Sequence, residues 1–160
     1  LNLSTQINKS FFNSTNSFSS IKILIYLIFT QIIFGAFVSG LDAGKIYQTW
    51  PLMNNSYFPD DSYLINVLNF DNQSIVQFIH RNLAYVIFFI SLFIGYQIIF
   101  KKIIKLIRSY YIFIFFIVLQ IVLGIITLLS NVNIYIASMH QISSIFLVIF
   151  SLKLYHRSID

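Results

Sequence analysis

Two histidines lie near the starts of two strongly apolar segments, His80 in QFIHRNLAY and His140 in SMHQISSIF. An ionisable side chain inside a bilayer is costly and usually faces the interior of a helix bundle, where it marks a functional site. Two imidazoles from facing helices are the ligand set of six-coordinate haem iron, one on each face of the ring. The alternative is that each histidine only hydrogen-bonds a neighbouring helix. A structural zinc site is a poor explanation, because it usually needs four ligands.

Arg81 follows His80 directly and is a second candidate functional residue. A guanidinium at this position can hold a haem propionate through paired hydrogen bonds, or it can extend into the lipid headgroups. A third histidine, His156, stands beside Arg157 at the far end of its segment, so we expect it at the membrane interface and outside the site. The chain has no cysteine, which excludes disulfides, thiolate metal sites and thiol catalysis.

The elements that position these residues are predicted to be membrane spans. Of the 160 residues, 58% are hydrophobic and only 9% charged, and IKILIYLIFTQIIFGAFVSG is apolar on every face over the length that crosses the hydrocarbon. We therefore predict an all-α integral membrane protein, a four-helix transmembrane bundle. The predicted spans cover roughly 21–40, 77–99, 110–130 and 133–154.

Three regions follow from this division. Residues 1–20 are rich in Ser and Asn and are predicted to be a polar loop or linker. Residues 21–156 form the four-span bundle, with a long loop at 41–75, and residues 157–160 form a short tail. Because residue 1 is Leu and no signal peptide is recognisable, we expect the sequence to begin inside a longer protein.

The basic residues predict the orientation of the chain. The net charge is +5, but Lys and Arg lie at the ends of apolar segments, where they set membrane topology, so we predict no nucleic-acid binding. One side of the membrane carries Lys45 and Arg81 only. The other carries Lys9, Lys22, Lys101, Lys102, Lys105, Arg108, Lys153 and Arg157. Both termini are therefore expected inside, with loop 41–75 and the two histidines near the outer face.

A weak internal repeat links the first and third predicted spans. TQIIFGAF and LQIVLGII place Gln31 and Gln120 four residues before Gly35 and Gly124, and each of these spans is followed by a span with a histidine. The repeating unit is thus a helix followed by a histidine helix. The small residues of GAFVSGLDAG predict either close packing between helices or room for a flat macrocycle.

Several blocks together resemble the carboxyl-terminal half of the haem A synthase family. They are GAFVSGLDAGKIYQTWPLM, NFDNQSIVQFIHRNLAY, LQIVLG and MHQ, and the resemblance runs from about residue 21 to the end. It implies an eight-span oxidoreductase with two similar halves, which oxidises the methyl group of haem O to the formyl group of haem A. It also implies that His80 and His140 ligate the iron of a b-type cofactor haem, haem b, and that the first half holds the substrate haem O.

The resemblance further implies a location and partners. It places the chain in the lipid bilayer of a bacterial plasma membrane or a mitochondrial inner membrane. The implied partners are the amino-terminal half of the same enzyme, haem O synthase and an electron acceptor. Loop 41–75, with its Trp-Pro turn, is expected to fold over the outward face of the haem site as a lid.

One departure from the family limits what this half is expected to do. The family's first half carries a glutamate three residues before its first histidine, whereas position 77 is Gln here and the chain contains no Glu. We therefore expect haem binding, no catalytic residue, and no complete reaction by this half alone. Two other predictions remain open: a small bis-histidine membrane cytochrome that only carries electrons, and a non-catalytic membrane subunit with structural histidines.

Overall fold

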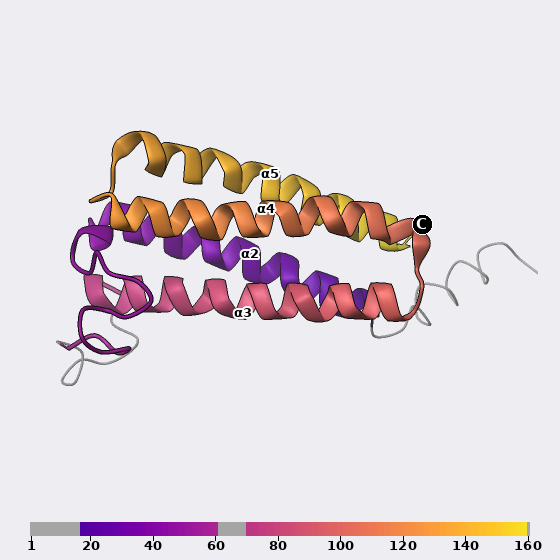
Figure 1. Cartoon of the computed structure of the whole chain (residues 1–160), viewed down its shortest axis with the longest axis horizontal. Helices are drawn as coiled ribbons and strands as arrows, with labels where there is room; N and C mark the ends of the chain where they lie inside the picture. Colours follow the sequence, from indigo (N-terminus) through magenta and orange to yellow (C-terminus); the bar gives the residue numbers. More distant parts are fainter. Residues whose placement is uncertain (1–16, 61–69, 160) are drawn as a thin grey trace, which may run out of the picture.

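The computed structural model describes residues 17–60 and 70–159, and four long helices account for most of them (Figure 1). They are α2 (Ser17–Gly40), α3 (Gln73–Phe100), α4 (Ile104–Leu129) and α5 (Ile134–Ile159), with a short 3-10 helix η1 (Ala43–Lys45) after α2. Each of the four is long and apolar enough to cross a membrane. The predicted all-α membrane bundle is therefore confirmed.

The helices are mostly longer than the predicted spans, because the prediction followed the apolar stretches and the helices include polar residues beside them. The added residues are at the starts of α2, α3 and α4 and at the end of α5. Helix α3 begins at Gln73, where the side chain of Asn72 caps it by accepting a hydrogen bond from the Ile75 amide. Helix α5 continues to Ile159, so most of the predicted tail 157–160 is helical. The predicted polar segment 1–20 lies mostly outside the described residues, and its last four residues already belong to α2.

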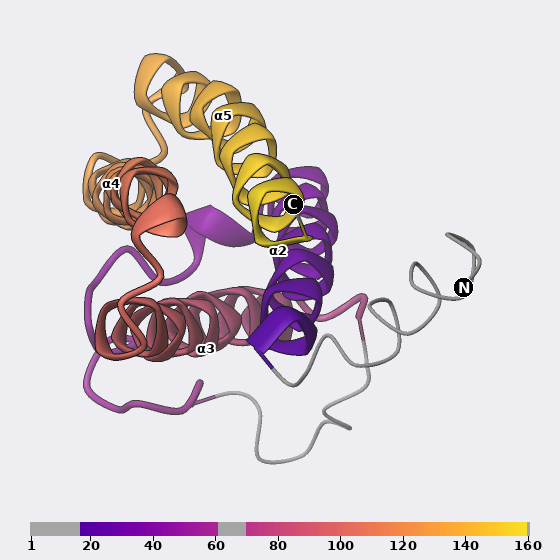
Figure 2. The same ribbon diagram turned by 90° about the vertical axis from the view of Figure 1, so that its right-hand side faces the viewer.

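The bundle is antiparallel between neighbours in the chain and has two different ends (Figure 1). We call the end that carries residues 41–60 the loop end, and the end that carries Lys101 and Lys102 the basic end. Viewed along the bundle, α3 and α5 occupy opposite corners, and α2 and α4 each pack against both of them (Figure 2). Helices α3 and α5 both start at the loop end and therefore run in the same direction.

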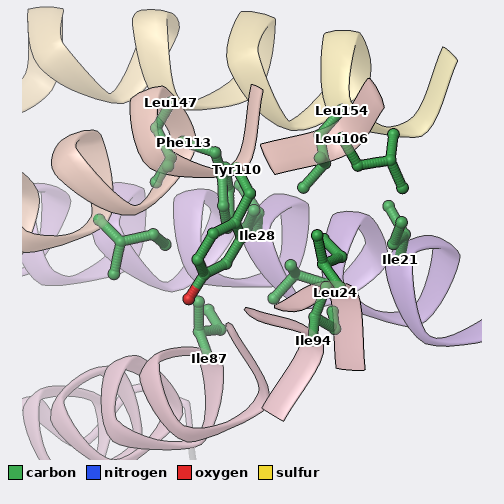
Figure 3. Packing of buried hydrophobic residues seen from close by; sticks show 12 residues of the cluster. Ile21, Leu24, Ile28, Ile87, Ile94, Leu106, Tyr110, Phe113, Leu147 and Leu154 are labelled. Atoms are coloured by element: carbon green, nitrogen blue, oxygen red, sulfur yellow. The ribbon is translucent and has the colours of Figure 1, made fainter. Parts of the chain in front are cut away.

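The apolar core fills only the half of the bundle next to the basic end, which we call the basic half. Its members interdigitate across all four helices (Figure 3), and in lipid such van der Waals packing is the main attraction between helices. All of them lie on the basic side of the helix midpoints except Ile117, which lies at the midpoint of α4. They are Ile21, Leu24, Ile28, Ile87, Ile94, Ile98, Leu106, Tyr110, Phe113, Ile117, Leu147 and Leu154.

The other half of the bundle, the loop half, has a different interior. Where the helices face one another there, they carry the two glutamines, the two histidines and the two glycines of the sequence repeat. Within the described helices, the long apolar side chains that are fully buried in this half are those of Ile75 and Val76, in the first turn of α3. The structure thus separates a densely packed half from one that is lined by polar and small residues.

Candidate functional site

The structure places the two predicted ligands at similar depth in the loop half. His80 lies seven residues after the start of α3, and His140 lies six residues after the start of α5. At a rise of about 1.5 Å per residue both lie about 10 Å from the helix starts. The two rings are close enough to interact electrostatically. His156 lies sixteen residues further along α5, near the basic end, so the structure keeps it apart from this pair.

The surroundings of His80 come from α2. The side-chain amide nitrogen Nε2 of Gln31 lies 3.3 Å from Nε2 of the His80 ring and donates a hydrogen bond of 3.0 Å to the His80 carbonyl. Gly35, one turn further along α2, faces the same ring, and a Cβ added to it would meet His80 Cε1 at 3.3 Å. The interior of the loop half is therefore fitted closely around this imidazole.

The surroundings of His140 come from α4 in a parallel arrangement. A Cβ added to Gly124 would meet His140 Cε1 at 3.2 Å. Gln120 differs from its counterpart in α2, because its Oε1 accepts a hydrogen bond of 2.9 Å from Ser143, which also contacts the His140 carbonyl at 3.0 Å. The repeat seen in the sequence thus corresponds to two spatial units, in which a glycine of one helix contacts the histidine of the next.

Both imidazoles have a buried nitrogen that lacks a hydrogen bond. Nδ1 of His80 and Nδ1 of His140 are buried, and among residues 17–60 and 70–159 neither has a partner of normal hydrogen-bond geometry. Buried polar atoms without partners are rare in proteins and call for a specific explanation. Within the described ranges, no group of three His or Asp side chains gathers around one point, so a metal ion that needs three or more protein ligands has no candidate site there.

Arg81 is engaged by the loop that follows η1. Its Nη2 donates to the Tyr47 carbonyl at 2.7 Å, and its Nη1 donates to the carbonyls of Thr49 and Leu52 at 3.0 and 3.3 Å. Its Nε is buried and has no hydrogen-bond partner among the described residues. No described carboxylate pairs with Arg81, whereas Lys45 pairs with Asp42 at 2.8 Å.

Arg81 belongs to a polar stripe on α3 that sequence reasoning missed. Gln73 donates to the carbonyl of Leu41, Gln77 donates to the carbonyl of Tyr47 at 2.9 Å, and Tyr85 accepts from the indole nitrogen of Trp50 at 3.0 Å. Together with Arg81 these side chains stand four residues apart, on one face of the helix. The four-residue spacing was the sequence signal that could have revealed this stripe. The hydrogen bonds of its side chains hold residues 41–52 against the start of α3.

A pocket opens between α3 and α4 beneath Trp50. Its volume is about 300 Å³, at the lower end of the range for small-molecule sites. Its lining begins five residues after His80 along α3 and lies within two residues of Gln120 along α4, but neither His80 nor His140 lines it. Its walls are apolar and mostly aromatic or β-branched: Trp50, Tyr85, Phe88, Phe89, Val118, Ile121 and Val122.

Comparison with known proteins gives a consistent result. Residues 3–152 match the family model described as cytochrome oxidase assembly protein, COX15-CtaA. The chain is 48% identical over 126 residues to the Heme A synthase of Pelagibacter ubique, covering 76% of this chain and 37% of the relative. It is 40% identical over 145 residues to the Heme A synthase of Wolbachia pipientis wMel, covering 89% of this chain and 39% of the relative.

A third relative shows the same pattern. The Heme A synthase of Bartonella henselae is 39% identical over 136 residues, covering 80% of this chain and 37% of the relative. The chain therefore spans less than two fifths of the length of these curated relatives. No solved structure matches it. From the family model and the identity to these relatives, we conclude that the chain belongs to the haem A synthase family.

Proposed function

We propose that this chain is the cofactor-binding part of a haem A synthase, with His80 and His140 as the axial ligands of a b-type haem. The observation that carries the proposal is the histidine pair itself. Two rings from diagonal helices stand at similar depth, and each has a buried nitrogen without a hydrogen-bond partner among the described residues. A bis-histidine haem needs two ligands of this kind and an apolar slot between helices.

The interior of the loop half also fits a bound macrocycle. The packed core stops at the helix midpoints, and the residues beyond it are small or polar, with an aromatic pocket alongside. When bound, the haem iron supplies one-electron redox chemistry. The histidines hold it, and the apolar walls keep water away from it.

Arg81 is proposed to hold a propionate of this haem. Its guanidinium lies one residue from His80, has no carboxylate partner among the described residues, and retains a buried Nε–H without an acceptor. A charge near the membrane interior is stabilised by an anionic partner, and a propionate carboxylate is complementary to a guanidinium. Its bonds to three loop carbonyls give it a second role, which is to connect the propionate site to the loop.

The loop itself is proposed to act as the lid of the site. Tyr47 and Met53 are buried, and Trp50 and Tyr57 contact α3 through Tyr85 and Asn82. The loop therefore covers the start of α3 next to His80. Such a cover excludes water from a reactive centre.

The complete enzyme is proposed to oxidise the methyl group of haem O to the formyl group of haem A. Gln77, three residues before His80, donates to the Tyr47 carbonyl and thus serves the loop, so this half offers no carboxylate at that position. The substrate haem is assigned to an amino-terminal half, and the electrons to an acceptor of the complete enzyme. Haem O synthase is the expected source of the substrate.

The proposed setting is a bacterial plasma membrane or a mitochondrial inner membrane. The loop end carries Lys45 and Arg81, whereas the basic end carries the lysines that follow α3 and the arginine at the end of α5. By the positive-inside rule the basic end faces the cytoplasm or matrix. The haem site then lies near the outer face.

The experiment is a reduced-minus-oxidised visible spectrum of membranes that contain the chain. We compare the wild type with His80→Ala, His140→Ala and the control His156→Ala, which removes a histidine at the other end of α5. We expect a low-spin b-type signal in the wild type and the control, and its loss in the other two. Retention of the signal in either of those two variants would contradict the assignment of ligands.

A second measurement separates an enzyme from an electron carrier with the same site. The two ligand substitutions are placed in the full-length protein, and cellular haem A is measured by chromatography of extracted haems. An enzyme loses haem A when either ligand is removed, whereas a carrier leaves the haem A content unchanged.

A further inference from the structure

We propose that Gly35 and Gly124 are positioning residues that seat the two imidazoles against the backbones of α2 and α4 and thereby set the strength of both axial bonds. The inference rests on the proposed haem site. It concerns residues that would not touch iron themselves but would act through the ligands.

The first observation is that both glycines contact the same edge of a histidine ring. A Cβ on Gly35 would lie 3.3 Å from Cε1 and 3.9 Å from Nδ1 of His80. A Cβ on Gly124 would lie 3.2 Å from Cε1, 3.7 Å from Nδ1 and 3.8 Å from Nε2 of His140, so Cε1 is the ring atom nearest to the glycine in both cases. A methyl group at either place would push the ring away by a few tenths of an ångström. The two helices therefore seat their rings in the same way.

The second observation concerns the backbone that each glycine exposes. In a helix, the carbonyl of residue i points toward the side of residue i+4, where a Cβ would shield it. Residue i is Gln31 for Gly35 and Gln120 for Gly124, and each of the two glycines faces a histidine ring. The missing side chain thus lets each ring approach a main-chain carbonyl.

A carbonyl at this place has a defined use in a ligated histidine. When one ring nitrogen binds a metal, the other carries a proton and usually donates it to a carbonyl or carboxylate, which fixes the ring and raises its basicity. Nδ1 of each ring is buried, has no hydrogen-bond partner among the described residues, and lies within 4 Å of the place of a Cβ on the glycine. Ligation at Nε2, for which the Gln31 side-chain amide has to turn away from His80, leaves Nδ1–H to the neighbouring glutamine carbonyl.

The third observation is that the chain contains a matched control. Gly40 lies on α2 with Gly35, and a Cβ added to it meets no atom within 4 Å. Alanine adds the same methyl group at all three glycines, and at Gly40, the last residue of α2, this group meets no histidine ring. Differences among the three variants therefore report the contact with the ring.

The test uses haem-loaded full-length protein with Gly35→Ala, Gly124→Ala or Gly40→Ala. We measure spin state by electron paramagnetic resonance, the fraction of haem that binds carbon monoxide, and the midpoint potential. We expect the first two variants to show a high-spin fraction and several-fold more carbon monoxide binding than wild type. Their potential should be more positive, because a less basic ligand stabilises ferric iron less. Gly40→Ala should match the wild type in all three readouts.

Each outcome bears on a different claim. If the wild type is low-spin and all three alanine variants match it, the positioning role of Gly35 and Gly124 is refuted, whereas the proposed haem site is not. If the wild type has no bis-histidine haem, the proposed function fails, and the inference fails with it. If Gly35→Ala or Gly124→Ala lacks haem, its helix content, measured by circular dichroism, distinguishes a local effect on the ring from a loss of folding. Helix content equal to that of Gly40→Ala supports a local effect on the ring, and reduced helix content contradicts it.

Discussion

Replacement of Arg81 separates the two roles proposed for it. Arg81→Gln removes the charge and the forked donor group, whereas Arg81→Lys keeps the charge but cannot span three carbonyls. Two of its hydrogen bonds are exposed, and water can replace them, so the bond to the Tyr47 carbonyl dominates. A hydrogen bond to a charged group contributes about 1.5–3 kcal/mol. At 1.4 kcal/mol per tenfold change, Arg81→Gln should raise the open population of the loop about 10- to 100-fold, and Arg81→Lys, which can still donate to one carbonyl, should raise it less.

Hydrogen exchange of two loop amides measures this opening. The Met53 amide donates to the Ser56 carbonyl at 2.8 Å, and the Asn54 amide donates to the Thr49 hydroxyl at 2.8 Å, so both are protected only while the loop is folded. Lys45→Gln is the control. It removes a cation of the same loop whose ion pair with Asp42 is exposed and contributes about 0–1 kcal/mol.

Haem content gives the second readout for the same variants. A propionate needs the positive charge, so Arg81→Gln should lose haem and Arg81→Lys should keep most of it. Unchanged amide protection in both variants would show that the carbonyl bonds do not hold the loop. Equal haem loss in both variants would refute an electrostatic role toward a propionate.

Other substitutions test the packing of the basic half. Phe113 is fully buried, and Phe113→Ala should destabilise the bundle by about 3–5 kcal/mol, measured by thermal unfolding in detergent. Phe115→Ala, on the exposed side of the same helix, should have little effect, and equal effects would contradict the core assignment. Gly95→Ala should cost about 1–3 kcal/mol, because the new methyl group meets the Tyr110 ring. The double variant with Tyr110→Leu should recover most of this loss, and a lack of recovery would show that the contact is not the cause.

Much of the fold follows from the sequence because bilayer spans have a simple signature. Four apolar stretches of the right length became four helices, and the paired histidines lie at similar depth, as their places in two parallel spans predict. The helix ends were less predictable. They depend on local contacts, such as the bond of 2.9 Å from Arg157 to Ser109 that ties the end of α5 to α4.

The surroundings of the site were only partly readable from the sequence. The spacing of Gln31 and Gly35 was visible, but not that Gly35 contacts His80, because one glycine suits both helix packing and a cofactor. Gly40, in the same stretch of small residues, shows that a glycine there need not contact a ring, because a Cβ added to it would meet no described atom within 4 Å. The acceptors of Arg81 were not predictable, because main-chain carbonyls are present at every residue and carry no sequence signature.

The position of the apolar core has a consequence for the order of biogenesis. All twelve core residues lie at the helix midpoints or between them and the basic end, so the four helices can associate before any cofactor arrives. Insertion into the bilayer and cofactor delivery then become separate events, and the delivery step completes a scaffold that already exists. Cells depleted of haem should therefore accumulate this protein in a membrane-inserted, protease-resistant form, and its rapid degradation there would show that the cofactor is needed for assembly.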